Sequence, residues 1–200
     1  RNALSCLKTN VRIPMNPSST QTYHDNHYSS YSTITRLDGF IVRINECYYV
    51  RKRDQNSISS KYDIFFIEHL WIDDNHIEQA SGFYYLRPDE TFHEVNRKFY
   101  FNELFRCPSI NETIELNFII RPCFVLDATT YCKGKPLCEY SSRILTSDLF
   151  ICEYRVDKLA RTFTRLPKSK HTNCNMKYYC FDNYIEKLSI KRDYQVCFKV

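Results

Sequence analysis

The stretch Tyr84–Arg106, YYLRPDETFHEVNRKFYFNELFR, decides the fold of this chain. It joins two runs of aromatic and aliphatic residues through a tight Arg-Pro-Asp-Glu-Thr turn. Pro88 has no backbone N–H to give to a sheet and restricts the residue before it, so the first run must end there. Thr91 and Glu94 have the spacing of a capping box, which predicts one helical turn. The pattern then predicts a second strand over Lys98–Leu104.

Strand-like patterns also lie on the N-terminal side of this stretch. Asp63–Ile72 is mostly apolar, and the turn residues Asp73-Asp74-Asn75 lead into Gln79–Leu86. We expect these two segments to pair antiparallel, because a short polar turn joins them. Phe40–Arg51 contains two short apolar runs separated by Asn45-Glu46, and this pattern favours a hairpin-like entry into the sheet.

Further short apolar elements follow towards the C-terminus. Two compact buried strands are expected within Cys123–Leu126 and Leu149–Tyr154, and Arg161–Leu166 is expected to form a hairpin with the second of them. Before these strands lies a segment whose pattern fits a strand or a helical turn equally well. Its apolar residues, which are predicted to be buried, are Ile114, Leu116 and Ile119.

The composition favours strands. The chain has 200 residues, enough for a single core with appendages, and it contains 3 Gly against 16 Tyr and 14 Phe. No apolar run reaches the roughly 18 residues that a membrane-spanning helix needs, and residues 1–20 have no signal-peptide core. We therefore expect a soluble, mostly β protein that begins within a longer sequence and has no membrane partner.

Several separated motifs together resemble one family. Besides the Arg-Pro-x-Glu-Thr turn, the Arg-Lys-Phe strand and the Glu-Leu-Phe segment of Tyr84–Arg106, they are CFVLDATTYCKGKP (Cys123–Pro136), DLFICEYRVDKLARTF (Asp148–Phe163) and CFDNYIEKLSIKRDY (Cys180–Tyr194). The chain resembles a bromo-adjacent homology (BAH) domain, a chromatin-interaction module. The likeness is to the C-terminal BAH domain of the "absent, small or homeotic" histone lysine methyltransferases.

This resemblance implies a distorted β-barrel of BAH type, with a few short helices and long loops. Residues 1–36 are rich in Ser, Thr, Asn and Pro and are expected to form an N-terminal arm or linker. We assign the BAH domain to 37–166, and residues 167–200 to a basic, aromatic extension that packs on the domain. The resemblance also implies a monomeric fragment of a nuclear, chromatin-bound regulator.

The ten cysteines leave two interpretations open. A secreted disulfide scaffold would agree with the glycosylation sequon at Asn111. A reduced, intracellular protein is favoured, because Cys47, Cys123 and Cys152 lie inside apolar runs, where a thiol behaves as a small hydrophobe. A zinc knuckle built from His171, Cys174 and Cys180 is a weaker alternative, since no Cys-x-x-Cys pair is present. We expect no bound metal and no cofactor.

Catalysis is not expected in this chain. No segment resembles a nucleophile elbow, a zinc-protease helix or a phosphate-binding loop. His93 lies in the turn motif, where a structural role is favoured over that of a general base. Arg87 and Glu90 of the same turn are expected to brace it through hydrogen bonds rather than to bind a ligand. The methyltransferase activity that the resemblance implies would belong to another part of the parent protein.

Charge is distributed unevenly. Residues 155–200 carry eleven Lys and Arg against four Asp and Glu, a net charge of +7, whereas residues 1–154 have a net charge of −2. Basic residues attract phosphates without reading sequence. Together with the resemblance to chromatin-interaction modules, this charge leads us to predict docking on nucleosomes through DNA, histone surface or both. The predicted contact residues are Lys168, Lys170, Lys177, Lys187, Lys191 and Arg192.

Two other binding modes remain open. By resemblance to BAH domains that read methyl-lysine, Tyr84 takes the position of a cage aromatic and Asp63 the start of the preceding strand, so these two residues form a candidate pocket. Tyr62 would face the other side of that strand, and Trp71 is expected in the core. In a scaffold role, the domain would bind neighbouring reader domains of its own chain or a protein partner, with arm residues such as Tyr23, Tyr28 and Tyr31 exposed.

Overall fold

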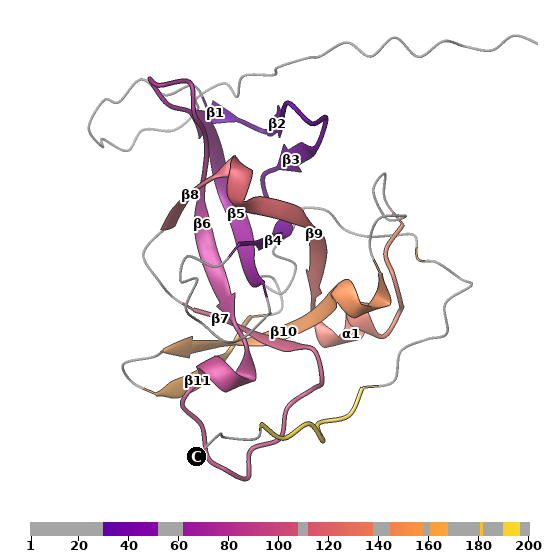
Figure 1. Ribbon diagram of the computed structural model, residues 1–200. Helices are drawn as coiled ribbons and strands as arrows, with labels where there is room; N and C mark the ends of the chain where they lie inside the picture. The colour runs from indigo at the N-terminus through magenta and orange to yellow at the C-terminus, as the bar shows by residue number, and fades with distance from the viewer. Residues whose placement is uncertain are drawn as a thin grey trace, which may run out of the picture.

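The computed structural model describes residues 30–51, 62–107, 112–137, 145–157, 161–167, 181 and 190–196. The strands are, in chain order, β1 (Ser30–Tyr31), β2 (Thr33–Thr35), β3 (Ile41–Arg43), β4 (Cys47–Val50), β5 (Asp63–Ile72), β6 (Glu78–Leu86), β7 (Glu103–Arg106), β8 (Glu112–Glu115), β9 (Ile119–Leu126), β10 (Leu149–Asp157) and β11 (Thr162–Arg165). The helical elements are η1 (Pro88–Glu90), η2 (Leu116–Phe118), α1 (Ala128–Tyr131) and η4 (Thr146–Asp148). The fold is therefore mostly β with short helical turns, as predicted (Figure 1).

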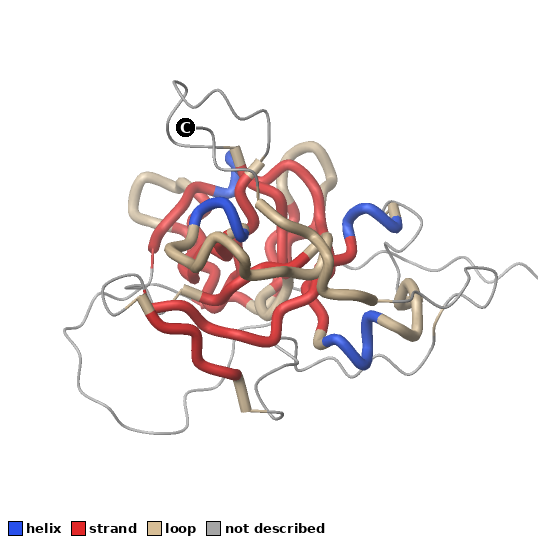
Figure 2. Tube along the Cα trace, turned by 90° about the horizontal axis from the view of Figure 1, so that it is seen from below, coloured by secondary structure: helices blue, strands red, loops and turns tan. Residues whose placement is uncertain are grey.

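The central strands form a closed ring. β5 pairs with β4, β4 with β9, β9 with β10, β10 with β7, β7 with β6, and β6 returns to β5. The β9–β10 and β10–β7 pairs are parallel and the others are antiparallel. Seen from below, these strands wrap around a common interior (Figure 2). The ring is an irregular barrel, because register shifts interrupt the β10–β7, β4–β9 and β5–β6 pairings, and the predicted distorted barrel is confirmed.

Alternation along the strands places side chains on both faces of this ring. In β4, Cys47 and Tyr49 point into a cluster to which all six ring strands contribute, while Tyr48 and Val50 point into a second cluster on the opposite face. The second cluster is covered by β2, β3, β8 and η2, so β4 is buried on both faces. The predicted burial of Cys47, Cys123 and Cys152 is confirmed.

The longest pairing, β5 with β6, contains a bulge at Ile67–His69 opposite Gly82. A Cβ atom added at Gly82 would overlap the backbone carbonyl of Phe66, so only glycine fits this crossing. The predicted strands Asp63–Ile72 and Gln79–Leu86, and their antiparallel pairing, are confirmed.

A third, smaller cluster closes one end of the barrel. It joins Leu86, Phe99, Phe105 and Val156 to Val196, which lies far along the chain. Two backbone hydrogen bonds between Phe99 and Tyr194, of 2.8 and 3.1 Å, hold the 190–196 segment against the loop that follows η1. This segment is seen in yellow beside the 88–102 loop in Figure 1.

Two local predictions in the Tyr84–Arg106 stretch are wrong in position. The helical turn is η1, Pro88–Glu90, and it lies before Thr91 rather than after it. The Glu90 carboxylate accepts a 2.7 Å hydrogen bond from the Arg87 backbone N–H, and this bond closes the turn ahead of Thr91. The strand after it is β7, Glu103–Arg106, later than the predicted Lys98–Leu104.

The predicted hairpin over Phe40–Arg51 is also wrong. β3 pairs with β2, whereas β4 pairs with β5 and β9. Asn45 has a left-handed backbone with φ of 62°, which turns the chain from one sheet into the other. Trp71 is half-buried rather than central to the core.

The C-terminal side agrees better with prediction. Ile114, Leu116 and Ile119 are buried, and the helix-or-strand ambiguity there resolves into β8 followed by η2. β11 pairs with β10 as the expected hairpin. In the described part of the chain, no helix is long and apolar enough to span a membrane.

Candidate functional site

A groove lies at the edge of the sheet, where β8 is the last strand in the order of pairing. It is lined by residues from β6, β8 and η2 and by Arg51 beyond β4, and its cavity volume is about 250 Å³. β8 is placed here by its pairing with β6, in which Ala80 faces Ile114. Both of these side chains are buried, so the packing of this apolar pair fixes the floor of the groove.

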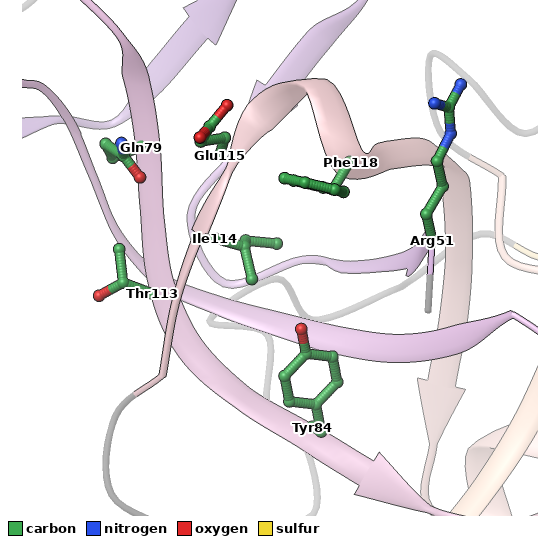
Figure 3. A pocket seen from close by; sticks show the side chains of 7 residues that line it. All are labelled: Arg51, Gln79, Tyr84, Thr113, Ile114, Glu115 and Phe118. Carbon is green, nitrogen blue, oxygen red and sulfur yellow. The ribbon is translucent and has the colours of Figure 1, made fainter. Parts of the chain in front are cut away.

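Two aromatic side chains give the groove its binding character. Tyr84 packs edge-on against Phe65, with the ring centroids 4.8 Å apart, and its hydroxyl points towards Ile114 and Phe118 (Figure 3). Phe118 is 40% exposed although it is a large apolar residue. The two aromatics line the same groove, Tyr84 from β6 and Phe118 from η2.

Charged groups stand at both sides of these aromatics. Glu115 and Arg51 lie on opposite sides of Phe118 (Figure 3). The Glu115 carboxylate accepts a 2.8 Å hydrogen bond from the Asn117 amide, which orients it at the end of β8. The groove therefore carries one carboxylate and one guanidinium beside its aromatic side chains.

The predicted partner of Tyr84 does not line this groove. Asp63 begins β5 and by alternation lies on the same face of the sheet as Phe65 and Tyr84, but it is absent from the groove lining. Tyr62 points to the opposite face, as expected, where its ring centroid lies 6.3 Å from that of Tyr49. Among the described residues, the structure therefore brings Tyr84 together with Phe118 and Glu115.

The turn that follows Tyr84 is braced as predicted. The Arg87 backbone N–H donates to the Glu90 carboxylate. The Arg87 guanidinium donates to the backbone carbonyl of Tyr62 at 3.1 Å and lies 5.7 Å from the centre of the Phe150 ring. These contacts tie η1 to the start of β5 and to β10. Arg87 and Glu90 hold the end of β6 in place.

The basic surface predicted for nucleosome docking falls mostly outside the described residues, which include only Lys191 and Arg192 of its six members. The Lys191 side chain is 82% exposed, and its ammonium lies 3.8 Å from the Asp193 carboxylate. An exposed pair at this distance is weak, so the lysine is accessible to a phosphate.

Arg192 has internal contacts instead. Its guanidinium lies between two carboxylates, 3.0 Å from Glu103 and 3.2 Å from Glu153, and stacks over the Tyr100 ring at 4.1 Å. Burial raises the pKa of Glu103, and this is opposed by the backbone N–H of Tyr100 and by Arg192. We therefore assign Arg192 to holding the 190–196 segment on the barrel and omit it from the docking surface.

Metal ligands are not gathered in the described part of the chain. No group of three or more His, Cys, Asp or Glu side chains there could hold a metal ion. His171, Cys174 and Cys180 lie outside the described residues. His93 packs against Phe99, with ring centroids 4.7 Å apart, and burial lowers its pKa.

The sequence pointed to Tyr84 but not to its neighbours in the groove. Phe118 and Glu115 belong to a segment predicted only to be buried, so their exposure could not be read from periodicity. Gln79, Thr113 and Arg51 carry no local signal for binding. The pairing of β8 with β6 brings Gln79 and Thr113 to the groove, and a 3.0 Å backbone hydrogen bond to the Phe118 carbonyl places Arg51 there.

Comparison with known proteins agrees with this architecture. The sequence model of the BAH domain matches residues 40–167. Over 133 residues the chain is 42% identical to "Histone-lysine N-methyltransferase ash1" of Drosophila melanogaster, an alignment covering 66% of this chain and 6% of that protein. It is 30% identical over 132 residues to "Probable histone-lysine N-methyltransferase lin-59" of Caenorhabditis elegans, covering 66% of this chain and 10% of the relative.

Similarity extends to chromatin remodelling subunits and to a solved structure. The "Chromatin structure-remodeling complex subunit rsc1" of Schizosaccharomyces pombe is 28% identical over 67% of this chain and 16% of its own length. The crystal structure of the yeast Rsc2 BAH domain superposes with a TM-score of 0.58 at 22% identity, covering 70% of this chain and 55% of that one. The chain thus spans a small fraction of its curated relatives.

The match over 40–167 contains the barrel ring, the braced Arg-Pro turn and the groove at β8. The relatives that share this region are named as histone-lysine N-methyltransferases, one of them probable, and as a chromatin-remodelling subunit. The matched region is a BAH domain, a non-catalytic module. This chain belongs to the BAH domain family.

Proposed function

We propose that the chain is a chromatin-interaction module that docks on nucleosomes through DNA and histone contacts, within a nuclear regulator of histone methyltransferase type. The observation that carries the proposal is the BAH domain itself, shared with methyltransferases and remodelling subunits that act on chromatin by name. The +7 net charge of residues 155–200 supports a phosphate-rich partner.

The proposed DNA-binding residues are Lys168, Lys170, Lys177, Lys187 and Lys191. Lys191 directly precedes Arg192, whose ion pair with Glu103 holds this part of the chain on the barrel, while the Lys191 side chain stays exposed. Contacts of this kind neutralise phosphates without reading bases, and the affinity would fall with salt.

Charge reversal at two lysines tests this contact. The double variant K187E/K191E should bind nucleosomes more weakly than wild type at low salt, with a shallower dependence of affinity on salt concentration. K98E is the control, because Lys98 is exposed on the loop before β7 and is not one of the proposed contact residues. Equal loss in K98E, or no loss in the double variant, would argue against a DNA contact through this segment.

A second function, reading of methylated lysine in a histone tail, is favoured by one specific observation. Tyr84, Phe118 and Glu115 all line a groove of about 250 Å³, which places two aromatic side chains and a carboxylate around one cavity. A methylammonium held against aromatic faces gains about 2 kcal/mol when it is desolvated. The predicted pair of Tyr84 with Asp63 is replaced in this proposal by Tyr84 with Phe118 and Glu115.

Histone-tail peptides with trimethylated lysine, compared with the same peptides unmodified, test the second function. Wild-type protein should bind a trimethylated peptide more tightly, and F118A should lose the difference. F101A is the matched control, since Phe101 is 77% exposed and lies outside the groove lining. Equal binding of methylated and unmodified peptides by wild type would remove this candidate and leave the DNA contact to be judged by itself.

A further inference from the structure

Two buried cysteines lie directly opposite each other in neighbouring strands of the barrel. Cys47 of β4 and Cys123 of β9 are register partners in an antiparallel pairing. Their exposed fractions are 2% and 3%, and both belong to the cluster inside the ring. The two thiols therefore share one face of the sheet as well as one position in the ladder.

This register places the pair within reach of a disulfide. Opposite residues in antiparallel strands have Cα atoms about 4.5 to 5.5 Å apart. Disulfides bridge Cα separations of about 4.4 to 6.8 Å. A bond between Cys47 and Cys123 therefore requires rotation of the side chains rather than movement of the strands.

A third cysteine in the same cluster provides a contrast. Cys152 of β10 is as deeply buried, but the described pairings give it no cysteine as register partner. Its thiol lies 3.6 Å from the carbonyl oxygen of Tyr154, and burial raises its pKa to about 12. All three cysteines are buried, so burial does not separate them. What separates Cys47 and Cys123 from Cys152 is that each has a cysteine directly opposite it in the neighbouring strand.

We propose that Cys47 and Cys123 form a reversible dithiol–disulfide modification site, with a hydroperoxide as oxidant. One thiolate attacks the peroxide, breaking the O–O bond, and becomes a sulfenic acid. The second thiolate then attacks that sulfur, forms the S–S bond and breaks the S–O bond, so that hydroxide leaves and is protonated to water. Overall, two thiols lose two electrons and two protons, and hydrogen peroxide is reduced to two molecules of water.

Burial determines how the site responds. Both thiols are almost fully buried inside the ring, so a peroxide reaches them only when the barrel opens locally, and oxidation would be slow in the native protein. Once formed, the bond would join two ring strands that are far apart in sequence, and it would constrain the unfolded chain. The oxidised protein should therefore melt at a higher temperature.

Peptide mapping of the whole native chain tests this site. The reduced protein is treated with hydrogen peroxide, the peroxide is removed, and remaining thiols are alkylated after denaturation. A linked peptide pair containing Cys47 and Cys123 should appear, with eight of the ten cysteines still open to alkylation, and dithiothreitol should restore all ten. Isolated sulfinic acids, a link through other cysteines, or ten intact thiols would each overturn the proposal.

Two variants sharpen this result. C152A should form the same Cys47–Cys123 link as wild type, because Cys152 has no part in it. C47A should form no link to Cys123, and a new link from Cys123 to Cys152 would contradict selection by register. If C47A does not fold, the wild-type and C152A maps still decide the question.

Discussion

Arg192 and Glu103 form an ion pair across the end of the barrel, with the Arg192 guanidinium 3.0 Å from a glutamate side chain that has no exposed surface. The glutamate begins β7, inside the region that matches the BAH family, whereas the arginine lies beyond residue 167, where that match ends. A buried charge of the barrel is thus neutralised by a segment outside the family match.

Removal of this arginine should destabilise the fold. R192A would leave Glu103 buried without its cation, and breaking such a pair costs about 3 kcal/mol. K191A, at the neighbouring exposed position, should change the free energy of unfolding by less than about 0.5 kcal/mol. Denaturant unfolding of both variants measures the difference, and equal stability of the two would show that Arg192 is not needed to balance Glu103.

Asp148 should control stability in acid. Burial acts to raise its pKa, but hydrogen bonds from Arg121, the Leu145 backbone and the Tyr49 hydroxyl outweigh this and lower the pKa below 3.8. A carboxyl with a lowered folded pKa contributes stability that is present above the unfolded pKa and is lost as pH falls through the folded pKa. The free energy of unfolding should therefore drop steeply below pH 3.8 in wild type and less steeply in D148N. Parallel curves would contradict this assignment.

Gly82 should not tolerate a side chain. In G82A the added Cβ would overlap the Phe66 carbonyl, so β5 and β6 would have to separate at the bulge, at a cost of about 3 kcal/mol or more. G39A is the control: Gly39 has φ of +79° and open space around it, so only backbone strain of about 1 kcal/mol is expected. Thermal melting compares them, and the opposite order would exclude a close backbone crossing at Gly82.

Substitutions of Phe118 and Leu116 should have different effects on ligand binding and on the stability of the fold. The two residues lie two positions apart in η2, but Leu116 is 1% exposed and Phe118 40%. L116A should lose about 3 kcal/mol of unfolding free energy, whereas F118A should lose less than about 1 kcal/mol. A large loss in F118A would show that this ring supports the core and is not held out for a ligand.

The strands of the barrel were largely predictable. Asp63–Ile72 and Glu78–Leu86 have strong apolar patterns and a polar turn between them, and these local signals agree with the tertiary structure. The hairpin expected over Phe40–Arg51 failed because period-2 patterning identifies strands but not their partners. The left-handed backbone of Asn45 instead sends β4 to β5 and β9.

The groove and the basic segment show two other limits of prediction from the sequence. Tyr84 was predicted from the family motif. Phe118 and Glu115 line the same groove because β8 pairs with β6, and no local sequence pattern encodes that pairing. Arg192 has the sequence context of a phosphate ligand beside Lys191, yet its side chain turns inward to Glu103. The packing around each side chain, rather than the local sequence, therefore decides that Lys191 is exposed and that Arg192 pairs with a buried carboxylate.

Nucleosome docking by this BAH domain is tested most directly by comparing its affinity for reconstituted nucleosomes with that for free DNA of equal length across a salt series. We predict binding to both at low salt, a decline as salt rises, and a preference for nucleosomes that persists where free DNA is no longer bound. Equal affinity for the two at all salt concentrations would contradict the histone contact and reduce the domain to a DNA-binding module. Absence of nucleosome binding at every salt concentration would contradict docking altogether.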